Sequence, residues 1–148
     1  MSDTPDDLPL PGVRALDHAA DVGLEVDASD LSELLRRAVG GLAWLLLERE
    51  PPFPTEERAL RVAAGEPASL LRELLRELLW WHDSEGLVAG GLRNVRLAQG
   101  TEGVSLEAMV ALSSPTEPPV REIKGVTLHG LLVEQREGGW HARVIFDV

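Results

Sequence analysis

Three side chains capable of acid–base or metal chemistry lie close together near the start of the sequence: Asp17, His18 and Asp21. Two carboxylates and an imidazole could bind a hard divalent cation or transfer a proton. They could equally be turn residues, since aspartate at a strand end often accepts hydrogen bonds from backbone N–H groups. Ca²⁺ takes about six to eight oxygen ligands. This cluster alone is therefore incomplete, and further ligands would have to come from elsewhere in the chain.

The end of the sequence offers candidate ligands, the carboxylate of Asp147 and the terminal carboxylate of Val148. Hydrophobic residues alternate through residues 140–146, which predicts a strand with one buried face. Asp147 falls on the opposite face of that strand, where it could coordinate a cation. The sequence alone does not place Asp147 beside Asp21, so an ordinary strand end remains the alternative.

Two further regions contain candidate functional residues. Lys124 and His129 flank a short apolar stretch, where they could belong to a functional surface or simply be solvated. Trp80 and Trp81 are adjacent on a predicted helix, so both cannot face its core side. One of them could lie in a groove or at an interface, where tryptophan is often an anchor residue. The alternative is that both pack beneath a loop.

The composition limits the class of function. The chain has 148 residues, with 14 Lys and Arg against 25 Asp and Glu, for a net charge of -11. This balance argues against strong direct binding to nucleic acid and permits docking onto a basic partner. The absence of cysteine excludes disulfides, Cys–zinc sites and thiol nucleophiles. The sequence also lacks a phosphate-binding glycine loop and a nucleophile elbow.

The hydrophobic pattern predicts one domain over residues 13–148, preceded by a disordered tail over residues 1–12 that is rich in proline and aspartate. No secretory pattern or apolar run of about 18 residues is visible, so we expect a cytoplasmic protein. We expect one helix to begin after Asp30, capped toward Glu33, and a second to begin at Pro67. Strands are predicted at 13–18, 22–28, 58–64, 94–98, 104–112, 125–135 and 140–147, with breaks that include Gly90-Gly91.

This order of elements predicts an α+β fold, as a two-layer sandwich in which two helices cover one face of a mixed or antiparallel sheet. Gly40 and Gly41 interrupt the leucine-rich pattern of the first helix. Each glycine costs on the order of 1 kcal/mol there. We therefore expect close packing of this helix against the sheet, with a kink as the alternative.

Four motifs, in the same order along the chain, resemble the archease family. They are His18-Ala19-Ala20-Asp21-Val22-Gly23, the leucine-rich 70–82 with its paired tryptophans, the I-K-x-x-T-x-H pattern at 123–129, and the final strand at 140–148. Departures include Ala19 where the family usually has threonine and Gly125 where alanine is common. The proline-rich loop at 113–121 also lacks an expected Gly-Glu.

The resemblance implies an archease-like fold and a protein that is not an enzyme by itself. It would assist an RtcB-type tRNA-splicing RNA ligase, promoting its GTP-dependent guanylylation and multiple turnover, and would meet tRNA only through that ligase. Asp21, Asp147 and Val148 would bind a divalent cation, expected to be Ca²⁺. His18, Lys124 and His129 would lie near the functional surface.

Two other functions remain open from the residues. The same acidic residues with His18 and His129 could serve a small metal-dependent hydrolase. Trp80-Trp81 and the acidic surface could serve a chaperone-like scaffold that binds many proteins.

Overall fold

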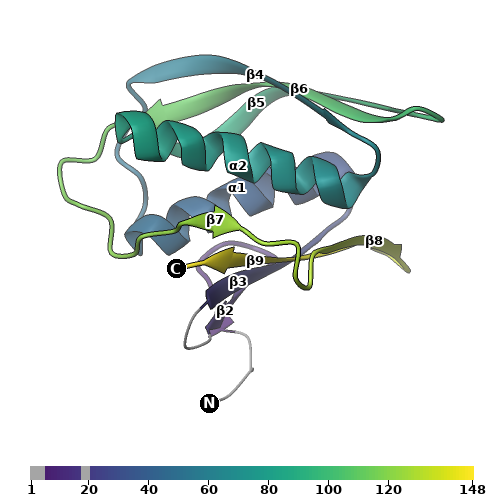
Figure 1. Cartoon of the computed structure of the whole chain (residues 1–148), viewed down its shortest axis with the longest axis horizontal. Helices are drawn as coiled ribbons and strands as arrows, with labels where there is room; N and C mark the ends of the chain where they lie inside the picture. The colour runs from purple at the N-terminus through teal and green to yellow at the C-terminus, as the bar shows by residue number, and fades with distance from the viewer. Residues whose placement is uncertain (1–5, 18–20) are drawn as a thin grey trace.

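The computed structural model describes residues 6–17 and 21–148, with only the backbone of Asp17 included. The chain forms three layers: a three-stranded sheet, a layer of two helices and a six-stranded sheet (Figure 1). The α+β class is confirmed, and every strand pairing is antiparallel among the described residues. The predicted two-layer arrangement is wrong, because the helices lie between two sheets and do not cover one face of a single sheet.

The six-stranded sheet has β3 and β9 at its centre. Its order is β1-β2-β3-β9, and both β7 and β8 pair with the far side of β9. The predicted single strand over 125–135 is thus two strands separated by a loop. The bounds are β1 (Asp6–Asp7), β2 (Val13–Asp17), β3 (Asp21–Ala28), β7 (Gly125–Val126), β8 (Leu132–Arg136) and β9 (Gly139–Asp147).

The three-stranded sheet has the order β4-β6-β5. The predicted break at Gly90-Gly91 does not occur, because β5 continues through it with a register shift between Ala89 and Gly91. A second shift lies beside Asn94, whose φ of 53° is in the left-handed region that asparagine tolerates. The bounds are β4 (Glu56–Ala64), β5 (Val88–Gly100) and β6 (Gly103–Ser113).

Helix α1 (Leu31–Leu47) begins where the sequence predicts. The side chain of Asp30 accepts a hydrogen bond from the backbone N–H of Glu33 at 2.8 Å. Apolar residues surround most of this helix, and such a helix needs packing partners on more than one side. It packs against β2, β3 and β9 of one sheet and β5 of the other. This burial explains why the helices form the middle layer.

Of the two adjacent glycines in α1, Gly41 is the one that lies in close contact with the sheet. A Cβ added there would lie 2.9 Å from a methyl carbon of Leu24 and 3.1 Å from one of Val13, which confirms the expected close packing. A Cβ added at Gly40 would meet only Leu10 at an ordinary 3.6 Å. One glycine is therefore required by the helix–sheet contact, and its neighbour is not.

Helix α2 (Pro67–Glu85) is amphipathic and carries a buried leucine stripe. Gly86 closes it in the left-handed conformation, with a φ of 73°. No helix in residues 6–17 and 21–148 is long and apolar enough to cross a membrane.

The segment before β2 differs from the expected disordered tail wherever the structure describes it. Asp6 and Asp7 pair with β2, and Leu8 and Leu10 pack against the core. The carbonyl oxygen of Gly12 accepts a hydrogen bond from the backbone N–H of Asp27 at 2.8 Å. Asp6 and Asp7 thus form one edge of the six-stranded sheet, and residues 8–12 connect them to β2.

Candidate functional site

The structure brings Asp21 and Asp147 together. Asp21 is the first residue of β3, and it lies directly opposite Asp147, the last residue of β9, in their antiparallel ladder. Directly opposed residues have Cβ atoms about 4.5–5.5 Å apart and project from the same face of the sheet. On the other side of β9, Gly125 of β7 lies opposite Asp147. The two carboxylates, which we call the acid pair, therefore stand side by side.

The environment of Asp21 is unfavourable for an isolated carboxylate. Its Oδ1 atom is fully buried and has no hydrogen-bond partner among the described residues. A buried unpaired polar atom costs free energy, and like charges directly opposed on a sheet add to that cost. A divalent cation would relieve both effects, and carboxylate oxygen is the donor that Ca²⁺ and Mg²⁺ prefer. The acid pair thus fits a hard cation.

The remaining positions of a cation shell are not filled by other side chains in the described part of the chain. Within residues 6–17 and 21–148, no group of three His, Cys, Asp or Glu residues is placed to hold a metal ion. His18, and the side chain of Asp17, lie outside what the structure describes. Val148 directly follows Asp147, and its side chain packs against the core. Val148 is therefore held at the same end of β9 as the acid pair.

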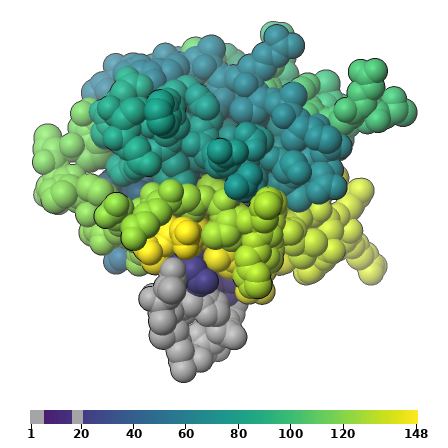
Figure 2. Space-filling model, in the orientation of Figure 1, coloured from purple at the N-terminus to yellow at the C-terminus, as the bar shows by residue number. Residues whose placement is uncertain are grey.

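Lys124 and His129 occupy different positions relative to the acid pair. The backbone N–H of Lys124 donates to the carbonyl oxygen of Asp147 at 2.7 Å, so Lys124 adjoins the acid pair. His129 is exposed in the loop between β7 and β8. Figure 2 shows the C-terminal residues at the surface, between the segment that contains β7 and the start of β3. Asp147 is exposed and Asp21 is partly exposed, so the acid pair is reached from solvent through Asp147.

The adjacent Trp80 and Trp81 differ in exposure, as expected for two consecutive positions on a helix. Trp81 is 8% exposed and lies beneath the guanidinium of Arg58, whose Cζ is 4.9 Å from the ring centroid. Trp80 is 64% exposed. It lines a hollow of about 510 Å³ between α2 and residues 124–126, which we call the α2–β7 groove. The sequence left open whether one tryptophan lies in a groove or both pack beneath a loop, and the structure places Trp80 at a groove.

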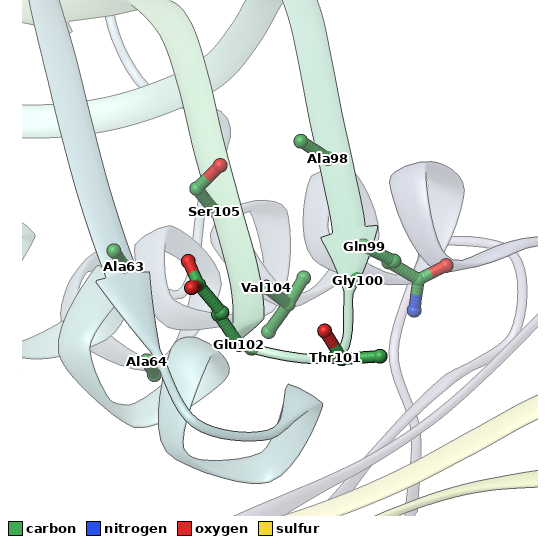
Figure 3. A pocket seen from close by; sticks show the side chains of 10 residues that line it. Ala63, Ala64, Ala98, Gln99, Gly100, Thr101, Glu102, Val104 and Ser105 are labelled. Carbon is green, nitrogen blue, oxygen red and sulfur yellow. The ribbon is translucent and has the colours of Figure 1, made fainter.

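A second hollow lies on the three-stranded sheet, at the turn between β5 and β6 (Figure 3). It measures about 440 Å³, and small residues such as Ala63 and Ala98 line it together with Thr101 and Glu102. None of the residues singled out from the sequence lines it. With one carboxylate and no second charged group in its lining, it has little means of binding a cation or a phosphate.

A compensated carboxylate lies at the other end of the β3–β9 ladder. Asp27 is opposite His141, which is 6% exposed, and the His141 Nδ1 lies 2.7 Å from the Asp27 Oδ1. Arg14 Nη2 donates to Asp27 Oδ2 at 2.7 Å. Burial alone would raise the pKa of Asp27, but the hydrogen bonds from His141 and Arg14 outweigh it and hold this pKa below its ordinary value of 3.8. Sequence reasoning missed this cluster because only the strand register shows it.

The fold and the acid pair define a small α+β protein with a helical layer between two antiparallel sheets and a candidate cation site at one end of the central strand pair. Residues 14–148 match the Archease protein family (MTH1598/TM1083), and the chain belongs to this family. The resemblance noted from the four motifs is thus confirmed.

Similar proteins include curated members of the family. The chain is 32% identical to Protein archease of Thermococcus gammatolerans over 136 residues, which cover 89% of this chain and 95% of the relative. It is 28% identical to the Probable protein archease of Mycobacterium tuberculosis, over 93% of this chain and 75% of the relative.

Two solved structures share the fold. The solution structure of Methanobacterium thermoautotrophicum protein 1598 superposes with a TM-score of 0.77 at 26% identity, covering 93% of this chain and 99% of that one. The crystal structure of a Thermotoga maritima archease, described as a possible chaperone, gives a TM-score of 0.57 at 22% identity and covers 90% and 94%. The second match shows the fold alone.

Proposed function

We propose that the protein activates an RtcB-type tRNA-splicing RNA ligase. It promotes the GTP-dependent guanylylation of the ligase, so that the ligase turns over repeatedly in joining tRNA halves. The observation that carries this proposal is the acid pair, in which Asp21 and Asp147 are directly opposed and Asp21 Oδ1 has no described partner. Family membership supports an accessory role, in which the protein acts on another enzyme.

The acid pair, together with Val148, would hold the cation, which we propose to be Ca²⁺. These groups supply fewer oxygens than the about six to eight that Ca²⁺ takes. When bound, the ion would present positive charge and open coordination positions to phosphate oxygens of the partner's nucleotide. The backbone N–H of Lys124 donates a hydrogen bond to the carbonyl oxygen of Asp147 and fixes the end of β9. The backbone of the acid pair is therefore in position before a cation binds.

The overall charge supports a protein partner over direct RNA binding. A net charge of -11 repels phosphate and attracts the basic surface that an RNA-handling enzyme presents. The protein would therefore approach tRNA only through the ligase.

The test is multiple-turnover ligation of tRNA halves by the cognate ligase with GTP and Ca²⁺, with and without this protein. Wild-type protein should raise turnover. Asp21→Asn and Asp147→Asn should each lower the stimulation at least about 10- to 100-fold, the loss seen when even outer-shell partners of a metal are removed. Glu102→Gln, at the exposed turn between β5 and β6, is the matched control and should stimulate normally.

Unchanged turnover with wild-type protein would overturn the proposed function. Full stimulation by both asparagine variants would instead remove the acid pair from it while leaving the activator role intact. Thermal unfolding of each variant checks that a loss of stimulation is not a loss of fold.

A chaperone function is the second candidate, because the Thermotoga maritima protein is described as a possible chaperone and Trp80 is exposed here. A chaperone should suppress aggregation of several unrelated unfolded proteins. Suppression confined to the ligase would favour the activator, and broad suppression would favour the chaperone.

A further inference from the structure

The α2–β7 groove adjoins the acid pair through its β7 wall. Lys124 and Gly125 line the groove, and the same two residues contact Asp147, by a backbone hydrogen bond and by strand pairing. Arg72 joins the two walls, because its Nε donates to the carbonyl oxygen of Val126 at 3.0 Å. The β7 backbone therefore connects the groove to the end of β9. The acid-pair side chains themselves alternate with buried Val22 and Phe146, so they project from the other face of the sheet.

Trp80 is the large apolar side chain of this groove, and the core does not need it. The leucine stripe of α2 and Trp81 already fill the buried side of the helix. Exposed tryptophan is rare where packing does not require it, and it is enriched among residues that dominate binding energy at interfaces. The position of Trp80 thus indicates a surface that becomes covered in a complex.

The charges around Trp80 indicate what covers it. Glu77 and Asp83 lie three residues before and after Trp80, so they flank the indole on the same face of the helix. Neither forms an ion pair with any residue that the structure describes. By contrast, Arg76 is already bonded to Glu73 at 3.1 Å. The helix wall therefore presents an aromatic ring between two uncompensated carboxylates.

This arrangement suits a guanidinium or ammonium group. A cation over an indole face is attracted by the ring, most strongly where water is excluded. Arginine in addition has planar N–H groups that reach carboxylates on either side. Lys124 lines the opposite wall of the groove, and Arg72 and Arg76 line it as well. Glu77 and Asp83 flank the ring itself, so they would repel a phosphate placed at Trp80, which argues against a nucleic acid as the occupant.

We propose that the α2–β7 groove is the docking site for an arginine- or lysine-bearing surface segment of the protein partner, with Trp80 as its anchor between Glu77 and Asp83. The inference rests on the proposed function for the identity of that partner, and on the groove itself for its chemistry. Docking here would bring the partner to the same end of β9 as the acid pair.

The chemistry of the groove can be tested without the ligase. The peptides acetyl-Arg-Gly-Arg-amide and acetyl-Glu-Gly-Glu-amide, and a short RNA oligonucleotide, are titrated into the full chain. The reporter is the Trp80 indole N–H resonance, which is assigned from its loss in Trp80→Phe. The arginine peptide should shift this resonance, and the Glu77→Gln/Asp83→Asn double variant should weaken that effect at least about fivefold. A shift with RNA alone, or no shift with the arginine peptide, overturns the proposal.

The second arm measures the affinity of the ligase and the stimulation of ligation as a function of protein concentration. Trp80→Ala should weaken ligase binding at least about tenfold and still reach near-normal stimulation at saturation, because the acid pair is intact. Phe53→Ala is the matched control: Phe53 is 91% exposed, does not line the groove and should bind normally.

The outcomes separate the two proposals. If wild-type protein stimulates and Trp80→Ala binds the ligase within twofold of it, the docking site is wrong and the activator function stands. If wild-type protein does not stimulate but the arginine peptide binds at Trp80, the activator function fails while the chemistry of the groove is supported. Loss of maximal stimulation without loss of affinity would also contradict a docking role.

Discussion

Carboxylates at the two ends of the β3–β9 strand pair lie in opposite environments, one charge-compensated and the other not. At one end, Asp27 is opposite His141 and is also bonded to Arg14, so its charge is compensated. At the other end, Asp21 is opposite another carboxylate, Asp147, and one of its oxygens is buried without a described partner. The backbone ladder is continuous between them, so the difference lies in the side chains.

This contrast distinguishes a structural end from a candidate functional one. A paired carboxylate stabilises the fold, whereas an opposed acid pair costs stability until something positive binds. Local conflicts of this kind are expected at functional sites, where the rest of the fold holds residues in an arrangement that they would not adopt alone. The acid pair therefore should respond to cations, and the Asp27 cluster should respond mainly to pH.

Calcium binding gives the largest expected effect on stability. A cation that binds only the folded protein should raise the free energy of unfolding by about 2.7 kcal/mol at 100 times its dissociation constant. Thermal or urea unfolding with and without CaCl₂ measures this gain. Asp147→Asn should abolish it and slightly stabilise the calcium-free protein, because one of two like charges is removed.

Asp27→Asn supplies the control for the comparison and should keep the full calcium effect. Equal loss of the effect in Asp27→Asn and Asp147→Asn would place the cation elsewhere and remove the distinction between the two ends.

Gly23→Ala should disturb the ladder between its two ends. A Cβ added there would lie 2.7 Å from Ile145 Cδ1 and 2.8 Å from the carbonyl oxygen of Val144. Because a backbone atom cannot move aside cheaply, β3 and β9 must separate, at a cost of about 1–3 kcal/mol in the free energy of unfolding. Urea unfolding measures this loss, and calcium titration should show a smaller gain as well.

The matched variant Gly91→Ala lies in β5, where an added Cβ meets nothing within 4 Å. It should be neutral or more stable by up to about 1 kcal/mol, because alanine restricts the unfolded chain. If Gly23→Ala and Gly91→Ala lower the free energy of unfolding by the same amount, the close contact at Gly23 is not the cause of the loss.

The pH dependence of the Asp27 cluster should be the smallest effect. The pKa of Asp27 in the folded protein lies below its ordinary value of 3.8, so the folded state binds fewer protons than the unfolded state in acid. Its contribution is complete above the unfolded pKa and is lost as pH falls through the folded pKa. The stability difference between wild type and Asp27→Asn should therefore shrink as the pH is lowered from 5 to below 3.

Urea unfolding across this pH range measures that difference. A difference that stays constant down to the lowest pH would show that the carboxylate charge of Asp27 is not what His141 and Arg14 stabilise.

Local sequence signals predicted much of the secondary structure. Alternating residues predicted β3 and β9, and Asp30 with Glu33 predicted the start of α1, because these features depend on neighbours in sequence. The glycine pair at 90–91 was misleading, since a β-bulge accommodates it within β5. Residue type made Asp21 and Asp147 candidate ligands, and the family resemblance then favoured Asp21 over Asp17 and His18.

The sequence by itself determined the α+β class, the capped helix and the candidate acidic residues, since each follows from residue type and local spacing. Only the tertiary structure decided that the helices lie between two sheets, that Asp21 is opposite Asp147, and that the α2–β7 groove adjoins them. The physical reason is that strand register and layer packing are set by contacts between distant segments. Those contacts also gave Asp27 its compensating partners and left Asp21 opposite a second carboxylate.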